Sequence, residues 1–340
     1  MAVANHALGM NNPFAAHYER CNTGDPADKY RDLPEFPHII DIEVTSACNY
    51  SCLMCPTGNL SLGRKPEFMS WATFETILNQ CVHYRTALRF IGWGEPLLGQ
   101  NRQPPVVLDF IKWAHRAQLL THLNTNGSLM YRDVAGRLLN EGLDSIKFSF
   151  QGTDGTTFEE MRNTKRIGPI HFEKLLETMR MFKEMRGARV LPWIAASTSI
   201  TYETPEMVAA FKERVEPLVD HLGVGTTIFD YMDMSAVRLR PAERATLERL
   251  RAFESTNKRH PVPCPQVYDS LSIHADGSVV VCCNSYDDTG KIGNVNETPI
   301  KEIWRHPKIE AYRERLARKD YNAPLCESCF DYMDCVEGKA

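Results

Sequence analysis

The sequence predicts an α/β fold, a partial (β/α)6 TIM-like barrel followed by a small cysteine-rich α+β domain. Between residues 38 and 230, six strand-like apolar runs alternate with helix-like segments, which is the pattern of parallel βαβ units. After Phe229 this alternation stops. Nine of the 11 cysteines fall into two groups, one after the first strand-like run and one in the last quarter of the chain.

Six segments are expected to form the barrel strands, because each is a short apolar run bounded by polar or turn-forming residues. They are 38–45, 87–93, 119–125, 144–150, 190–200 and 222–229. Helices are expected near 70–84, 104–117, 130–141, 170–186 and 204–219. Ser70 is a suitable N-cap for the first helix, and Pro205 stands near the start of the last. Six strands indicate an open barrel instead of a closed one with eight.

The last part of the chain has a different pattern. Residues 241–256 are typical of a charged helix, and the proline-rich stretch 261–265 leads into a new unit. An Asp276-Gly277 turn between two short apolar runs predicts a β-hairpin, and a helix around Trp304 follows it. We therefore expect an N-terminal extension over 1–37, a barrel over 38–235, a linking helix over 236–260 and a small domain over 261–340.

Composition narrows the classes of function. The 340 residues include 39 Lys and Arg against 43 Asp and Glu, a net charge of −4, which argues against nucleic acid as a partner. No apolar run reaches the roughly 18 residues of a membrane span, so no membrane partner is expected. The first twenty residues lack the apolar core of a signal peptide, which predicts a cytoplasmic protein. Thiols stay reduced in that compartment, so the cysteines are expected to bind metal or do chemistry.

The first cysteine group, Cys48, Cys52 and Cys55, directly follows the first predicted strand. Its spacing would also fit one face of a helix, but Pro56 and Gly58 close behind it favour a loop. A structural zinc ion usually has four ligands, and no fourth one stands nearby. Three thiolates around a four-iron cluster leave one iron open to a small molecule.

This C-x3-C-x2-C spacing after the first strand of a (β/α) pattern resembles the radical S-adenosylmethionine (SAM) superfamily. The resemblance implies a 4Fe–4S cluster whose open iron chelates SAM, and an electron donor such as flavodoxin or ferredoxin. Cleavage of SAM then gives a 5′-deoxyadenosyl radical that abstracts a hydrogen atom from the substrate. Met54, before the last cysteine, differs from the aromatic residue that is frequent at that position.

The resemblance also implies SAM-binding residues at the ends of later strands, where barrel chemistry collects. Gly92-Trp93-Gly94-Glu95 resembles the Gly-Gly-Glu segment that meets the SAM amino group, with Trp93 in place of the first glycine; an ordinary turn is the alternative. A guanidinium fork suits the SAM carboxylate, although the arginine assigned to it could equally lie in a solvated loop. The candidate SAM-binding residues are Gly94, Glu95, Asn126, Ser149, Gln151 and Arg162.

The second cysteine group resembles a zinc ribbon when it is considered alone. Together with the first group it resembles the SPASM/Twitch auxiliary-cluster domain. The longer SPASM form continues with another cysteine where this sequence has Lys339, so the resemblance implies one auxiliary 4Fe–4S cluster. The expected ligands are Cys264, Cys282, Cys326 and Cys329, with Cys335 as an alternative.

A fully ligated auxiliary cluster has no open iron, so electron transfer is its expected role. It could accept the electron of a substrate radical, which gives a dehydrogenation, or a thiol could quench the radical, which gives an epimerisation. Cys283 and Cys335 are the candidate thiols, and Asp230 and Asp233, after the sixth strand, are candidate bases. The alternative for Cys283 is an ordinary half-buried thiol, and the alternative for the two aspartates is a solvated acidic loop.

The expected function is a radical SAM oxidoreductase or epimerase that acts on a small-molecule substrate such as a sugar, an aminocyclitol or a nucleoside-like compound. The alternative is a peptide-modifying maturase that cross-links or epimerises a ribosomally made peptide. Such enzymes often carry an extra N-terminal peptide-binding domain, and only 37 residues precede the first predicted strand here. A third possibility is a zinc-stapled binding module without catalytic activity.

Overall fold

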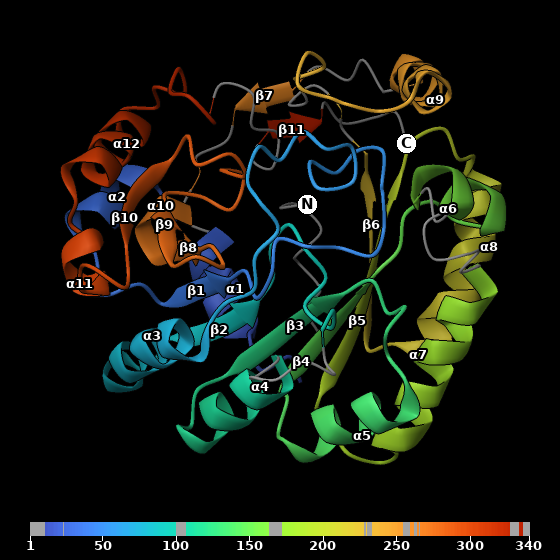
Figure 1. Ribbon diagram of the computed structural model, residues 1–340, viewed down its shortest axis with the longest axis horizontal. Coiled ribbons are helices and arrows are strands. Elements are labelled where there is room, and N and C mark those ends of the chain that lie inside the picture. Colours follow the sequence, from blue (N-terminus) through green and yellow to red (C-terminus); the bar gives the residue numbers. More distant parts are fainter. Residues whose placement is uncertain are drawn as a thin grey trace.

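One large sheet organises the protein. The computed structural model describes residues 11–22, 24–99, 107–162, 172–227, 229, 233–253, 259–261, 264, 266–326 and 333–335. Within these ranges nine strands form a sheet in the order β10-β9-β8-β1-β2-β3-β4-β5-β6, and β7 pairs with β11. From β1 to β6 all neighbouring strands are parallel. Figure 1 shows these six strands as a curved sheet with helices along its outer side, which confirms the partial barrel.

The six predicted barrel strands all form. They are β1 (Ile39–Ile42), β2 (Ala87–Phe90), β3 (Thr121–Thr125), β4 (Ser145–Ser149), β5 (Trp193–Ile200) and β6 (His221–Thr226). The first of them is buried along its whole length, as expected for parallel strands that carry helices on one face and a filled interior on the other.

The five predicted helices form as well. They are α3 (Trp71–Tyr84), α4 (Val107–Arg116), α5 (Arg132–Asn140), α7 (Phe172–Arg186) and α8 (Pro205–Val215), which the 3-10 turn η3 (Glu216–Leu218) extends. Ser70 caps α3, because its hydroxyl accepts the Thr73 N–H at 3.0 Å. The short helix α6 (Gly155–Arg162) lies where no helix was predicted.

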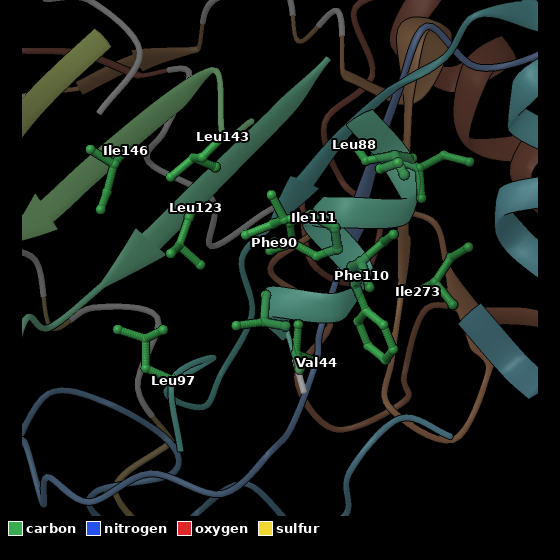
Figure 2. Close-up of a cluster of buried hydrophobic side chains, with 14 of the residues drawn as sticks. Val44, Leu88, Phe90, Leu97, Phe110, Ile111, Leu123, Leu143, Ile146 and Ile273 are labelled. Atoms are coloured by element: carbon green, nitrogen blue, oxygen red, sulfur yellow. The ribbon is translucent and has the colours of Figure 1, made fainter. Parts of the chain in front are cut away.

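The main core lies between the sheet and its outer helices. Phe90 of β2 packs against Phe110 of α4, and the rings of Phe74 and Phe110 stack at 4.1 Å. Figure 2 shows side chains of β2, β3 and β4 converging with those of α4. Because these side chains hold the strands in register, the loops at the carboxyl ends of the strands start from a rigid base.

The predicted C-terminal hairpin forms and joins the barrel sheet. β8 (Ser270–Ile273) is antiparallel to β9 (Ser278–Val280) across the Asp276-Gly277 turn, and β10 (Lys291–Asn294) pairs with β9. β8 also runs parallel to β1, with Ile273 opposite Ile42. The cysteine-rich part of the chain is therefore attached to the barrel through continuous strand pairing.

Helices complete the C-terminal part. The charged helix is α9 (Pro241–Ala252), and α10 (Gln266–Asp269) precedes β8. The helix expected around Trp304 is α11 (Ile300–Ile303), and it is followed by α12 (Pro307–Ala317). The small ribbon consists of β7 (Arg259–Pro261) and β11 (Met333–Cys335). No helix in the described ranges is long and apolar enough to cross a lipid bilayer.

The N-terminal extension contributes two helices that the sequence did not predict, α1 (Ala15–Asn22) and α2 (Pro26–Arg31). Asp269, at the end of α10, is buried and pairs with Arg20 at 2.8 Å and with Lys29. Figure 1 shows α2 beside α12. These contacts tie the beginning of the described chain to its last third.

Candidate active site

The first cysteine group lies in an irregular loop directly after β1, as predicted, and not in a helix. The loop turns tightly, because the Cys55 N–H donates to the Cys52 carbonyl at 3.2 Å and the Asn59 N–H donates to the Cys55 carbonyl at 2.8 Å. A Cβ at Gly58 would stand 2.2 Å from the Cys52 carbonyl oxygen. Only glycine fits there, so this residue keeps the loop closed.

The three thiols of this loop influence one another electrostatically. Burial, followed by repulsion from Cys52, raises the pKa of Cys48. The same two causes raise the pKa of Cys55 to about 11. Clustered thiols that resist ionisation by themselves are suited to a metal cluster, which stabilises their thiolate forms.

Arg162 reaches this loop from the end of α6. Its side chain is buried, one Nη lies 3.6 Å from the Cys52 sulfur, and the other donates to the Ser149 carbonyl. The guanidinium also lies 5.4 Å from the centre of the Tyr50 ring. Within the described residues its Nε and the Ser51 hydroxyl have no hydrogen-bond partner. A buried charge with an unsatisfied donor fits an anionic group of a bound cofactor.

The segment after β2 lies directly against the cysteine loop. A Cβ at Gly94 would stand 2.1 Å from the Thr45 carbonyl oxygen, and the Glu95 N–H donates to the Ala47 carbonyl at 2.9 Å. The Glu95 carboxylate is buried, which raises its pKa. It accepts hydrogen bonds from the Thr125 hydroxyl and the Asn126 N–H, both at 2.7 Å. Glu95 therefore joins the ends of β2 and β3.

Asn126 completes this group, because its amide donates to Asn49 at 3.0 Å and lies 4.0 Å from the Cys48 sulfur. The structure thus brings Gly94, Glu95, Asn126 and Arg162 together around the cysteine loop. Ser149 is half-buried at the end of β4. The Gln151 amide donates to the Thr227 hydroxyl at 2.6 Å and to the Ser199 carbonyl at 3.2 Å, so part of its hydrogen-bonding capacity links neighbouring strands.

Three of the four expected ligands of the second group have described side chains, and they gather around two tyrosines. Burial raises the pKa of Tyr312, and the nearby Cys326 and Cys282 raise this pKa further. Burial likewise raises the pKa of Tyr268, and Cys264 raises this pKa further. Cys264 and Cys326 also pack on the same small apolar cluster. Cys329 lies outside the described residues.

The candidate catalytic residues lie in different parts of the C-terminal half of the chain. Cys283 is exposed, and Cys335 is placed in β11 by its backbone only. Asp230 lies outside the described residues. Asp233 is exposed, and hydrogen bonds from the Ser235 hydroxyl and N–H lower its pKa. That carboxylate is therefore ionised at neutral pH and partly engaged in its own turn.

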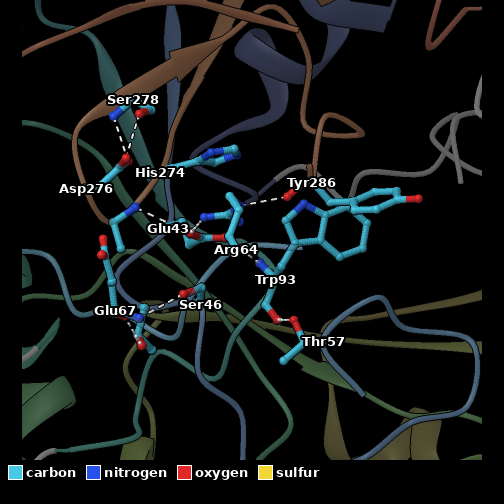
Figure 3. A network of polar contacts seen from close by, with 12 residues as sticks. Glu43, Ser46, Thr57, Arg64, Glu67, Trp93, His274, Asp276, Ser278 and Tyr286 are labelled. Carbon is cyan, nitrogen blue, oxygen red and sulfur yellow. Dashed lines mark hydrogen bonds and ion pairs between the residues drawn. The ribbon is translucent and has the colours of Figure 1, made fainter. Parts of the chain in front are cut away.

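One feature of the site was missed at the level of the sequence. Glu43, directly after β1, forms a buried ion pair with Arg64, and the ring of Trp93 meets that of Tyr286 at 5.5 Å. Figure 3 shows this network. The position of Glu43 at the end of an apolar strand could have indicated a buried carboxylate, but nothing in the sequence indicated that Arg64 is its partner.

Comparison with known families agrees with this geometry. The profile of the Radical SAM superfamily matches residues 42–215, just over half of the chain. The chain belongs to the radical SAM superfamily. The profile of the SPASM iron–sulfur cluster-binding domain matches residues 264–330. The protein is therefore a SAM-dependent radical enzyme and not a zinc-stapled binding module.

Related proteins extend over most of the chain. The PqqA peptide cyclase of Gluconobacter oxydans is 30% identical over 320 residues, which cover 87% of this chain and 84% of the relative. The Fe-coproporphyrin III synthase of Methanosarcina barkeri is 21% identical in an alignment 363 positions long, which covers 88% of each chain.

Solved structures share the fold. The structure of Streptococcus suis SuiB bound to its precursor peptide SuiA matches with a TM-score of 0.63 and 14% identity, covering 95% of this chain and 76% of SuiB. The structure of BtrN with AdoMet and 2-DOIA matches with a TM-score of 0.52 and 18% identity, covering 87% of this chain and 98% of BtrN.

The radical SAM and SPASM domains bring two kinds of cofactor, a 4Fe–4S cluster that binds SAM and an auxiliary iron–sulfur cluster. The donor chemistry of the described residues agrees with both cofactors, although no three Cys, His, Asp or Glu side chains in the described ranges already stand close enough together to hold a metal ion. The loop after β1 supplies three neighbouring thiols and the unsatisfied Arg162 Nε. Cys264, Cys282 and Cys326 gather around Tyr268 and Tyr312.

Proposed function

We propose that this radical SAM enzyme modifies a peptide, by cross-linking or epimerising one of its residues. The observation that carries the proposal is the 30% identity with PqqA peptide cyclase, which spans 87% of this chain and 84% of the relative. This proposal replaces the small-molecule substrate that the sequence led us to expect and adopts the alternative. Neighbours that share the fold support it, since SuiB and anSMEcpe have been solved with bound peptides.

An open strand edge near the site also supports a peptide substrate. β6 ends the large sheet, and its outer edge has no strand partner among the described residues. Five of its six residues are half-buried and Thr226 is exposed, and Gly223 has no side chain to block an approaching chain. Such an edge offers unpaired N–H and C=O groups to an extended peptide.

A cluster held by Cys48, Cys52 and Cys55 would supply one electron to SAM, which would give methionine and a 5′-deoxyadenosyl radical. This radical would take a hydrogen atom from a peptide C–H bond and leave as 5′-deoxyadenosine. In a cross-link the carbon radical would form the new bond and a proton would pass to a base such as Asp233. An auxiliary cluster held by Cys264, Cys282 and Cys326 would supply the acceptor for the remaining electron. In an epimerisation a thiol, Cys283 or Cys335, returns a hydrogen atom to the opposite face.

The test uses the reconstituted, reduced protein with SAM and, as probe, the Gluconobacter oxydans PqqA peptide made with perdeuterated residues. We expect peptide-dependent formation of 5′-deoxyadenosine that carries deuterium. The labelled peptide should become about 4 Da lighter per cross-link, because two deuterium atoms leave, or about 1 Da lighter per epimerised residue, because a thiol hydrogen replaces one deuterium. A variant with Cys48, Cys52 and Cys55 changed to Ala is the control and should give neither.

The small-molecule function remains as a second candidate because of one observation, the match that covers 98% of BtrN. The same assay with 2-DOIA in place of the peptide separates the two. Label transfer from deuterated 2-DOIA without any from the peptide would overturn the peptide proposal. Label transfer from the peptide alone would exclude the small-molecule function.

A further inference from the structure

Glu43 is a buried carboxylate that gathers hydrogen bonds from three other segments. It stands directly after β1 and is 2% exposed. Its two oxygens accept both Nη groups of Arg64 at 2.8 Å. The Trp93 N–H, in the SAM-binding segment after β2, and the Ala275 N–H, in the turn of the C-terminal hairpin, also donate to it, each at 3.3 Å.

Arg64 extends this junction to the loop that begins with the auxiliary ligand Cys282. Its Nε donates to the Tyr286 carbonyl at 2.7 Å. The Tyr286 ring then meets the Trp93 ring edge to face at 5.5 Å, and the Trp93 carbonyl accepts the Thr57 hydroxyl. Figure 3 shows that these side chains form one connected network. The SAM-binding segment and the loop after Cys282 therefore both bond to this ion pair, and the first cysteine loop joins the network through Trp93.

The chemistry of this pair makes it a rigid connection. All three nitrogens of the guanidinium are used, two on Glu43 and one on Tyr286, and a planar fork allows little change of angle. The carboxylate is too buried to exchange its partners for water. A shift of the Cys282 loop must therefore move Arg64 and, through Glu43, the backbone of Trp93.

We propose that the Glu43–Arg64 pair is a positioning element that couples the auxiliary-cluster loop to the SAM-binding segment. A ligated auxiliary cluster holds Tyr286 and Arg64 in place, and these hold Trp93 and the adjacent Gly94-Glu95 in the conformation that binds SAM. The coupling is reciprocal, so SAM also stabilises the auxiliary-cluster loop. It does not depend on the identity of the substrate.

The test is a double-mutant cycle read by SAM affinity in the reconstituted full chain. Cys282→Ala, which removes an expected auxiliary ligand, should weaken SAM binding about five- to tenfold in the natural background. With Arg64→Lys or Glu43→Gln already present, the same change should have less than about a twofold further effect. The second readout is the EPR spectrum of the reduced first cluster, whose response to SAM should change with each variant that breaks the link.

The chain offers a matched control in the Asp41–Arg89 pair. It is another bidentate ion pair, between the buried Asp41 of β1 and the half-buried Arg89 of β2, with distances of 2.6 and 2.8 Å. Among the described residues, Arg89 also contacts the Tyr18 ring, and neither Asp41 nor Arg89 contacts the loop of Cys48 or the loop of Cys282. Asp41→Asn should therefore leave the full effect of Cys282→Ala in place.

Two outcomes would overturn the proposal. In one, Cys282→Ala weakens SAM binding equally with and without the Glu43–Arg64 pair. In the other, it has no effect on SAM binding at all. Should Glu43→Gln fail to fold, Arg64→Lys removes the fork that joins Glu43 to Tyr286 while keeping a positive charge beside the buried carboxylate. Neither outcome bears on the peptide substrate, because SAM affinity is measured without a substrate.

Discussion

Ile42 and Ile273 lie opposite each other in neighbouring parallel strands, although they stand near opposite ends of the chain. Both are almost completely buried in the same core. The C-terminal hairpin therefore continues the barrel sheet, and the two cysteine loops start from one rigid element. The position of one loop relative to the other follows from strand register, not from a flexible linker.

The shared sheet predicts cooperative unfolding. Ile273→Ala should cost about 2–4 kcal/mol of stability and should speed hydrogen exchange in β1 and β2 as much as in β8. Hydrogen-exchange mass spectrometry of the protein measures both regions. Val190→Ala, at a side chain that is 60% exposed, is the control and should change stability by less than about 0.5 kcal/mol. Faster exchange confined to β8, β9 and β10 would contradict a single cooperative unit.

Gly94 should tolerate no side chain. A Cβ there would stand 2.1 Å from the Thr45 carbonyl and 2.5 Å from the Ala47 carbonyl, and backbone atoms of a packed loop cannot move aside cheaply. We expect Gly94→Ala to cost about 1–3 kcal/mol and to weaken SAM binding at least about tenfold, a change of about 1.4 kcal/mol. At Gly155 a Cβ meets nothing within 4 Å, so Gly155→Ala should bind SAM normally. Equal behaviour of the two variants would refute the steric argument.

Arg162 should tune both SAM affinity and the first cluster. Its guanidinium lies 3.6 Å from the Cys52 sulfur, so replacement by Gln removes a positive charge from beside the cluster. We expect a lower reduction potential in an EPR-monitored titration. We also expect SAM binding to be about ten- to a hundredfold weaker, as for loss of a charge-assisted hydrogen bond. Arg186→Gln, at an equally buried arginine that pairs with Asp220, should change neither quantity. An unchanged potential in Arg162→Gln would rule out this role.

His122 should make the protein less stable in mild acid. The buried ring interacts with Ser145 at 2.8 Å and with Asn124 at 2.9 Å. Burial, with a smaller contribution from Lys147, lowers its pKa to about 3. Below about pH 6.5 the unfolded chain binds a proton that the folded chain does not, so stability falls by up to about 1.4 kcal/mol per pH unit.

Urea unfolding at pH 6.5 and pH 5.5 measures this effect. The wild-type protein should lose about 1 kcal/mol more over this interval than His122→Gln. His83→Gln, at an exposed histidine, should follow the wild type. An identical pH dependence in wild type and His122→Gln would show that this ring does not titrate between the two states.

The two cysteine groups should lose their metal independently. Changing Cys48, Cys52 and Cys55 to Ala should remove about four irons per chain and abolish SAM cleavage. Changing Cys264 and Cys282 should remove the auxiliary cluster while the first cluster still gives its EPR signal with SAM. Cys81→Ala, at a buried cysteine of α3, should keep the full iron content. Loss of all iron from either set alone would show that the clusters do not assemble separately.

Much of the fold could be predicted because its signals are local. Burial of a strand on both faces leaves a short, mainly apolar run in the sequence, as in β1. Ser70 caps α3 through residues three positions apart. The helix α6 was missed because it has only eight residues and its first half, Gly-Thr-Thr-Phe, consists of weak helix formers. It forms where Phe158 and Met161 find buried positions. Packing decided this element, not propensity.

The substrate class lay outside these local signals. Cysteine spacing and the strand ends around Gly94 and Asn126 concern the cofactors, which members of the superfamily share. They carry no information about the molecule whose C–H bond is attacked. The preference for a peptide came from comparison over nearly the whole chain.

The sequence by itself determined the cofactor chemistry, because three thiols at Cys48, Cys52 and Cys55 lie within eight residues and need no distant partner to form a cluster site. Only the tertiary structure decided how the two cysteine groups are connected. The pairing of β8 with β1, the hydrogen bond of Arg64 with Tyr286, and the contact of Trp93 with Tyr286 join segments that are far apart in the chain. Such contacts depend on the register of a folded sheet and on which charges are buried together, and neither leaves a pattern in the local sequence.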